Sequence, residues 1–108
     1  MQEENSVLPI APLEKQGALQ ILIYLYEKNE KANISEITEN VKSSRETILS
    51  TIELLKITGL IRDLRNTKVF PYAHVVWLTP KGREVAQHLL AASHVLRRPE
   101  HPEENQDV

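Results

Sequence analysis

Hydrophobic positions recur at helical spacing near the start of the chain, where they form two adjacent stripes on one predicted helix. Residues 13–29 carry one apolar stripe of Ala18, Ile21, Leu22 and Leu25, and a second beside it of Leu19, Ile23 and Tyr26. A helix that is apolar on two faces is covered on two sides, so we expect a buried first helix. Two covers fit the second stripe equally well: another subunit, or the C-terminal helix of the same chain.

The middle of the chain predicts two helices joined by a tight turn, which is a helix-turn-helix. Ser35 is expected to cap the first helix of this pair, which runs over 35–41. The turn is "KSS", and the second helix follows over about 45–58. The inner face of this second helix consists of Ile48, Ile52 and Leu55.

Two polar signals mark the ends of the second helix. At its start, Ser43 and Glu46 fit the capping box S-x-x-E, with Ser44 as the competing cap. At its end, Gly59 is placed to adopt the left-handed conformation that closes many helices. The helix is therefore delimited on both sides by the sequence itself.

The remaining pattern predicts a β-hairpin followed by a long helix. The strands lie near 60–65 and 74–79, and Thr79 with Pro80 opens a helix that extends to residue 98. Its apolar line is Val85, Leu89, Ala92 and Leu96. A helix of this length reaches roughly 28 Å, so we expect it to project from the domain or to cross a partner.

This order of elements predicts a mainly α fold with a small β-hairpin wing (α+β). The architecture is a winged helix-turn-helix with an N-terminal helix and a long C-terminal helix. We expect one domain over residues 13–98, a flexible N-terminal tail over 1–12, and a disordered acidic tail over 99–108.

Charge is distributed unevenly along the chain, which has 108 residues and a net charge of −2. Residues 1–41 hold three Lys and seven Glu, for a net −4. Residues 42–83 hold eight Lys or Arg and three Asp or Glu, for a net +5, and residues 84–108 carry −3. The basic charge thus coincides with the helix-turn-helix and the wing, where it would serve nucleic-acid binding.

Composition narrows the remaining classes of function. The chain has no cysteine, which excludes disulfides and thiolate metal sites and fits a cytoplasmic protein. The chain has four histidines, and their spacing predicts surface residues and not metal ligands: His74, His88, His94 and His101. No nucleophile–base arrangement and no membrane-length apolar run occurs, so we expect no enzyme, no cofactor, no metal and no membrane partner.

Two stretches resemble winged helix-turn-helix transcription regulators, particularly the MarR-like group and the related PadR- and ArsR-like groups. They are "ISEITENVKSSRETILSTIELLKITGLI" (34–61) and "VVWLTPKGREVAQHL" (75–89), which contains the L-T-x-K-G-R junction common in MarR-like proteins. The resemblance covers roughly residues 13–92. It implies a homodimer that binds a pseudo-palindromic site in double-stranded DNA.

The resemblance also implies which residues face DNA. The turn and the second helix would contribute Lys42, Ser43, Ser44, Arg45, Glu46, Thr47 and Ser50. The wing would contribute Arg62, Arg65 and Lys68, whose alternative role is a solvated strand edge. Arginine reads guanine edges and lysine neutralises phosphates, so both residue types suit the role.

One feature of the second helix opposes this interpretation. Its outer positions are Glu46, Ser50, Glu53, Leu54 and Ile57, and two acids with two aliphatic side chains are unusual on a groove-reading surface. The alternative function is therefore a winged-helix protein–protein interaction module that does not bind DNA. A salt titration of DNA binding separates the two hypotheses.

A dimer is expected from the two-faced first helix and the long last helix. The candidate interface residues are Leu19, Ile23, Tyr26, Leu89 and Leu96. Regulators of this type often bind a small ligand between the dimerisation helices and the DNA-binding lobe, so an effector of unknown identity is a further partner to consider.

Overall fold

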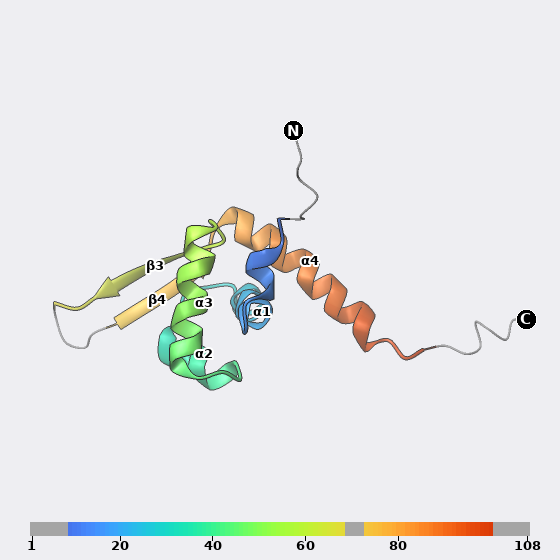
Figure 1. The fold of residues 1–108 in the computed structure, drawn as a ribbon, viewed down its shortest axis with the longest axis horizontal. Coiled ribbons are helices and arrows are strands. Elements are labelled where there is room, and N and C mark those ends of the chain that lie inside the picture. The colour runs from blue at the N-terminus through green and yellow to red at the C-terminus, as the bar shows by residue number, and fades with distance from the viewer. Residues whose placement is uncertain (1–8, 69–72, 101–108) are drawn as a thin grey trace, which may run out of the picture.

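The computed structural model describes residues 9–68 and 73–100 and has the predicted α+β architecture. The elements follow in the order η1 (Ala11–Glu14), α1 (Ala18–Lys28), β2 (Ala32–Asn33), α2 (Ile34–Asn40), α3 (Arg45–Ile57), β3 (Ile61–Asn66), β4 (Ala73–Leu78) and α4 (Pro80–Arg97). The β3–β4 hairpin, the wing, extends from one side of the helical body, and α4 extends from the opposite side (Figure 1). Both predicted tails fall mainly outside the described residues.

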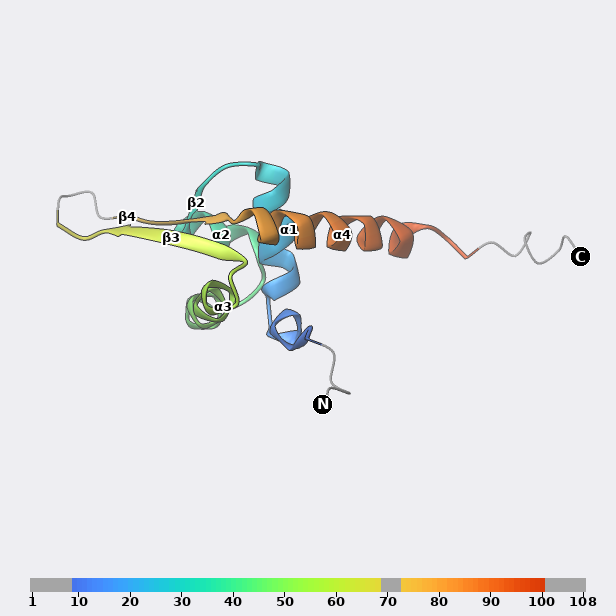
Figure 2. The same cartoon turned by 90° about the horizontal axis from the view of Figure 1, so that it is seen from above.

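The core lies where the apolar faces of the first three helices meet the base of the sheet. All three inner residues of α3, Ile48, Ile52 and Leu55, are 0% exposed. The first stripe of α1 is equally buried, which confirms that this face points inward. From α4, Ala86 closes the core, while the C-terminal half of that helix runs out beyond it (Figure 2).

The first helix begins later than the sequence predicts. A short 3₁₀ turn, η1, precedes it, and Gly17 then adopts a left-handed φ of 86° before α1 starts at Ala18. A chain with a left-handed residue cannot continue as one α-helix, so the predicted start at residue 13 is wrong. The break is fixed by Thr51 of α3, whose buried hydroxyl donates a 2.7 Å hydrogen bond to the carbonyl oxygen of Gln16.

A third strand, β2, was not predicted. Its residues Ala32 and Asn33 pair antiparallel with Val76 and Val75 of β4, giving the strand order β2-β4-β3. Two residues are too few to show a period-two pattern. Asn33 also caps α2, because its side-chain oxygen accepts a 2.8 Å hydrogen bond from the backbone N–H of Glu36. The predicted cap, Ser35, is therefore wrong.

Both ends of α3 are closed by the expected types of cap. Of the two candidate serines, Ser44 is the N-cap, and its hydroxyl accepts a 3.1 Å hydrogen bond from the N–H of Thr47. Gly59 has a φ of 84°, and its N–H bonds to the carbonyl of Lys56. The next N–H, from Leu60, reaches the carbonyl of Leu55 at 2.9 Å, which completes a Schellman motif.

The wing is tied to the body where β4 passes into α4. Thr79 caps α4 by accepting a hydrogen bond from the N–H of Gly82, and its hydroxyl donates to the carbonyl of Gly59 at 2.7 Å. Gly82 lies so close to the chain before β3 that a Cβ there would stand 1.9 Å from the carbonyl oxygen of Leu60. The entry and exit of the hairpin are thus locked together.

Candidate nucleic-acid interface

The outward face of α3 carries three of the residues predicted to contact DNA, Arg45, Glu46 and Ser50. Its exposed side chains are Arg45, Glu46, Ser50, Glu53 and Ile57. Ser44 is exposed in front of the helix, while Ser43 and Thr47 are half-buried. The hydroxyl of Ser44 accepts a hydrogen bond from the backbone N–H of Thr47, so these hydroxyl side chains lie around the first turn of α3. The backbone dipoles of a helix favour an anion at this end.

A shallow groove of about 470 Å³ separates α3 from the wing. One wall is formed by Arg45, Leu49 and Glu53, which follow one another every four residues along α3. The other wall is formed by Arg65, Thr67 and His74 of the wing. The structure therefore brings Arg45 and Arg65, which the sequence assigns to separate elements, to one surface.

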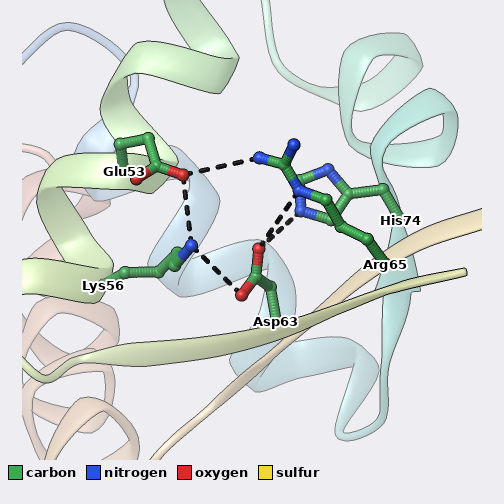
Figure 3. A network of polar contacts seen from close by, with 5 residues as sticks. All are labelled: Glu53, Lys56, Asp63, Arg65 and His74. Atoms are coloured by element: carbon green, nitrogen blue, oxygen red, sulfur yellow. Dashed lines mark hydrogen bonds and ion pairs between the residues drawn. The ribbon is translucent and has the colours of Figure 1, made fainter. Parts of the chain in front are cut away.

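A chain of polar contacts crosses from α3 to the wing below this groove (Figure 3). The Lys56 ammonium lies 3.1 Å from the Glu53 carboxylate and 3.2 Å from Oδ1 of Asp63. The other Asp63 oxygen lies 2.7 Å from Nε2 of His74 on the neighbouring strand. Asp63 therefore contacts both the helix and the second strand of the wing.

Arg65 belongs to the same chain of contacts. Its Nη2 lies 3.6 Å from the Glu53 carboxylate, and its Nε lies 3.9 Å from Oδ2 of Asp63. Glu53 and Asp63 thus balance two of the cations that make residues 42–83 basic, Lys56 and Arg65. Because Arg65 is already paired within the protein, the phosphate contact predicted for it competes with these two acids.

The surroundings of Asp63 favour its ionised form. Burial by itself raises the pKa of this carboxyl group, but the hydrogen bond with His74 and the contact with Lys56 outweigh it, so the pKa is lowered. The pKa of Lys56 is raised, first by its hydrogen bond to Glu53 and then by the one to Asp63. Both groups are therefore charged at neutral pH.

The other predicted cations are arranged differently. Lys42, Arg62 and Lys68 are exposed, and among the ion pairs of the described residues none involves Arg45, Arg62 or Lys68. Side chains alternate along a strand, so Arg62 lies on the face of the hairpin opposite to Asp63. Of the predicted cations, those without an ion pair among the described residues thus lie at the start of α3 and along the wing.

Sequence reasoning missed Lys56, Asp63 and His74 as members of this surface. Period-two spacing in "LIRDLR" could have placed Asp63 and Arg65 on one face of the strand. The partner of Asp63 on the other strand depends on the register, which pairs Arg65 with His74. His74 lines the groove with its side chain 15% exposed, and its Nε2 lies 2.7 Å from Asp63, a contact that the prediction of a surface histidine did not include.

The candidate dimer residues divide into two groups. Tyr26 and Leu89 pack against the core of the same chain, and the guanidinium of Arg83 lies 5.5 Å from the centre of the Tyr26 ring. Leu19 is 43% exposed and Leu96 is 83% exposed, and Ile23 is half-buried, between the two groups. Cover within one chain therefore accounts for only part of the second stripe of α1 and for the first half of α4.

The described residues offer no group of three or more His, Cys, Asp or Glu side chains that could hold a metal ion. In the same part of the chain, no helix has both the length and the apolar character needed to cross a membrane.

Comparison with solved structures finds a similar fold in several proteins that are described as transcriptional regulators. A transcriptional regulator homologue from Pyrococcus horikoshii OT3 matches with a TM-score of 0.67 and 24% identity, over 82% of this chain and 86% of that one. A MarR-family protein from Enterococcus faecalis V583 matches with a TM-score of 0.67 and 12% identity, over 86% and 89% of the two chains. The transcriptional regulator BldR from Sulfolobus solfataricus matches with a TM-score of 0.58 and 22% identity, over 82% and 66%.

No protein-family model matches the chain, and no curated protein matches it either. The three structural matches are below 25% identity, so they establish the fold alone. The chain has the winged-helix fold that MarR-like regulators share.

Proposed function

We propose that the protein is a dimeric transcription regulator that binds double-stranded DNA. In this proposal α3 enters the major groove, and the wing lies along the backbone or in the minor groove. The observation that carries the proposal is the placement of Arg45 at the exposed start of α3, free of ion pairs within the described residues and next to the wing. The neighbouring folds, which are named as transcriptional regulators, support it.

The proposed contacts fall into two kinds. Arg45 is the candidate for reading a base edge, since arginine binds guanine with two hydrogen bonds. Lys42 in the turn, with Arg62 and Lys68 on the wing, supplies phosphate contacts that release counterions. Around the helix start, Ser43, Ser44, Thr47 and Ser50 offer hydroxyl groups, and Glu46 either opposes phosphate or accepts a hydrogen bond from cytosine.

The test begins with selection of bound duplexes from a random DNA library, followed by titration of the selected site at rising salt. We expect affinity to fall steeply with salt, and Arg45→Gln to lower affinity for the selected site by about tenfold or more. Arg98→Gln is the matched control, because it removes the same charge beyond the end of α4. No binding at low salt, or equal effects of both variants, contradicts the proposal.

The dimer is proposed to form through the uncovered part of α4 together with α1. Val95 and Leu96 are 54% and 83% exposed, and apolar side chains at helical spacing favour burial against a second copy. Leu96→Ser is expected to shift sedimentation toward the monomer, whereas Leu64→Ser, an exposed leucine on the wing, should not. A wild-type monomer at micromolar concentration contradicts this part of the proposal.

A second candidate function rests on a specific observation on α3. Ile57 is 79% exposed beside Glu53, which suits docking to a protein better than to a phosphate backbone. In that case Ile57→Ser abolishes binding of a protein partner recovered with the wild-type chain, and Arg45→Gln leaves it intact. Salt-sensitive DNA binding that survives Ile57→Ser favours the regulator instead.

The proposal describes a binding protein in the cytoplasm, not an enzyme. It requires no cofactor and names no effector.

A further inference from the structure

Three kinds of contact hold the wing to the body. Ile61 and Val76 are buried in the apolar core, and β4 also pairs with β2 at Val75 and Val76. On the face of the hairpin that meets α3, the side chains from Asp63 outward are charged: Asp63 and Arg65 contact α3, and His74 lies opposite Arg65 on β4. Apolar packing and strand pairing therefore fix the inner part of the hairpin, and the charged contacts connect its outer part to α3.

Asp63 is the centre of these charged contacts. Its side chain is only 13% exposed, and it contacts Lys56 from α3, His74 from β4 and Arg65 from its own strand. Figure 3 shows Asp63 between the helix and the hairpin, with Glu53 and Arg65 making a second connection farther out. Partly buried, mutually bonded charges have fixed geometry, in contrast to isolated surface pairs.

We propose that Asp63 is the positioning residue of the wing. Through Lys56, His74 and Arg65 it sets the angle between the hairpin and α3, so that Lys68 meets the DNA backbone while α3 is in the groove. Arg65 acts through this network and not through a phosphate contact of its own. The inference rests on the proposed function, since it names the residue that organises the DNA-binding surface.

The proposal predicts an effect opposite in sign to simple electrostatics. Asp63→Asn removes a negative charge from the side of the protein that faces DNA, and charge alone would then strengthen binding. If Asp63 positions the wing, the same substitution weakens binding, because the neutral amide loses its attraction for Lys56 and Arg65. The sign of the change therefore distinguishes the two mechanisms.

The experiment measures binding of a selected duplex as a function of salt for Asp63→Asn and for Glu39→Gln. Glu39→Gln is the matched control, since it removes one exposed negative charge from α2, outside the proposed DNA contacts. We expect Asp63→Asn to bind about tenfold more weakly and its salt slope to fall by about one, the value of one lost phosphate contact. Glu39→Gln should bind as tightly as wild type or more tightly. Binding by Asp63→Asn that is unchanged or stronger overturns the proposal.

Double variants separate wing orientation from a general loss of the fold. In the Asp63→Asn background, Lys68→Gln and Arg65→Gln should each cost little more, because the contact they affect is already lost. Arg45→Gln should keep its full effect there, since α3 is anchored by its own buried face. A full additional effect of Arg65→Gln overturns the role assigned to Arg65. If Arg45→Gln also has no further effect in the Asp63→Asn background, and the Tm of Asp63→Asn is lowered, the positioning role is overturned. Asp63 then contributes to the stability of the whole fold.

A measurement without DNA keeps the inference separate from the proposed function. Amide hydrogen exchange in Asp63→Asn should become faster in β3 and β4 and stay unchanged in α1, whereas Glu39→Gln should alter neither. If wild type does not bind DNA, the proposed function fails, and exchange alone decides whether Asp63 fixes the wing. Unchanged exchange in β3 and β4 overturns the positioning role in either case.

Discussion

The helical body and the wing junction are stabilised in different ways. In the body, the inner face of α3 is completely buried among apolar side chains, and no charge enters it. At the junction, α3 meets the wing through five charged or ionisable side chains that remain partly open to solvent. Packing is worth several kcal/mol per residue and is insensitive to salt, whereas the junction depends on pH and salt. The position of α3 is therefore fixed by packing, whereas the orientation of the wing relative to α3 depends on charged contacts.

The largest effect on this comparison is expected from Ile52→Ala in the body. Ile52 is 0% exposed, so its truncation removes apolar contacts and leaves a cavity, at a cost of about 3 kcal/mol in the free energy of unfolding. Ile57→Ala on the same helix is the control, because Ile57 is 79% exposed and should cost little. Urea denaturation measures both. A cost for Ile52→Ala close to that of Ile57→Ala would show that α3 is not held by packing.

Gly82→Ala tests the point where the body and the wing are locked together. The new Cβ would collide with the backbone oxygen of Leu60, and we expect a net loss of about 2 kcal/mol even though alanine favours helices. Gly59→Ala makes a useful comparison, since it meets no atom within 4 Å but has a φ of 84°. Its cost, about 1 kcal/mol, arises from backbone strain alone. If Gly82→Ala loses no more stability than Gly59→Ala, the close approach of Gly82 to the carbonyl oxygen of Leu60 is contradicted.

Thr51→Val should have a smaller effect, confined to the break before α1. The valine keeps the volume but loses the hydrogen bond to the carbonyl of Gln16, which costs about 1 kcal/mol when that oxygen is left without its donor. Thr38→Val is the control, because its hydroxyl bonds only to the carbonyl of Ile34 within its own helix. Thermal unfolding of the two variants compares them, and an equal Tm for both would remove Thr51 as an anchor.

The smallest expected effect on stability concerns the junction, where a contribution that is present at neutral pH is lost in acid. The pKa of Asp63 is lower in the folded protein than its ordinary value of 3.8, so its ionisation favours folding above that value. This contribution is lost as pH falls through the lowered pKa. The difference in unfolding free energy between wild type and Asp63→Asn should therefore shrink as the pH falls below about 4. A constant difference between pH 7 and pH 3 contradicts the charged contact.

Local signals in the sequence were sufficient for the end of α3 and the start of α4. Gly59 defines a backbone conformation and Thr79 bonds within a few residues, so their roles follow from short spacing. At the start of α3 the same signals left Ser43 and Ser44 as competing caps, and at the start of α2 they indicated Ser35 where Asn33 is the cap. Gly82 and Thr51 could not be interpreted in this way. Their partners, Leu60 and Gln16, are distant in the sequence, and nothing in the local pattern connects them.

The candidate site divides along the same line. The exposed face of α3 follows from helical periodicity, and the structure leaves Arg45 and Ser50 exposed as expected. The prediction of Arg65 as a free cation missed its acidic neighbours, because Glu53 comes from another element. Counting charge along a chain cannot detect pairing between elements.

The sequence by itself determined the order of the four α-helices and the two hairpin strands, the buried face of α3 and the glycine that ends it, because periodicity and capping act over a few residues. Only the tertiary structure decided that β2 completes the sheet, that Gly82 admits no side chain, and that Asp63 meets Lys56 and His74. Each of these depends on a strand register or on a distance between elements far apart in the chain. Such distances follow from packing the whole domain, which no local pattern encodes.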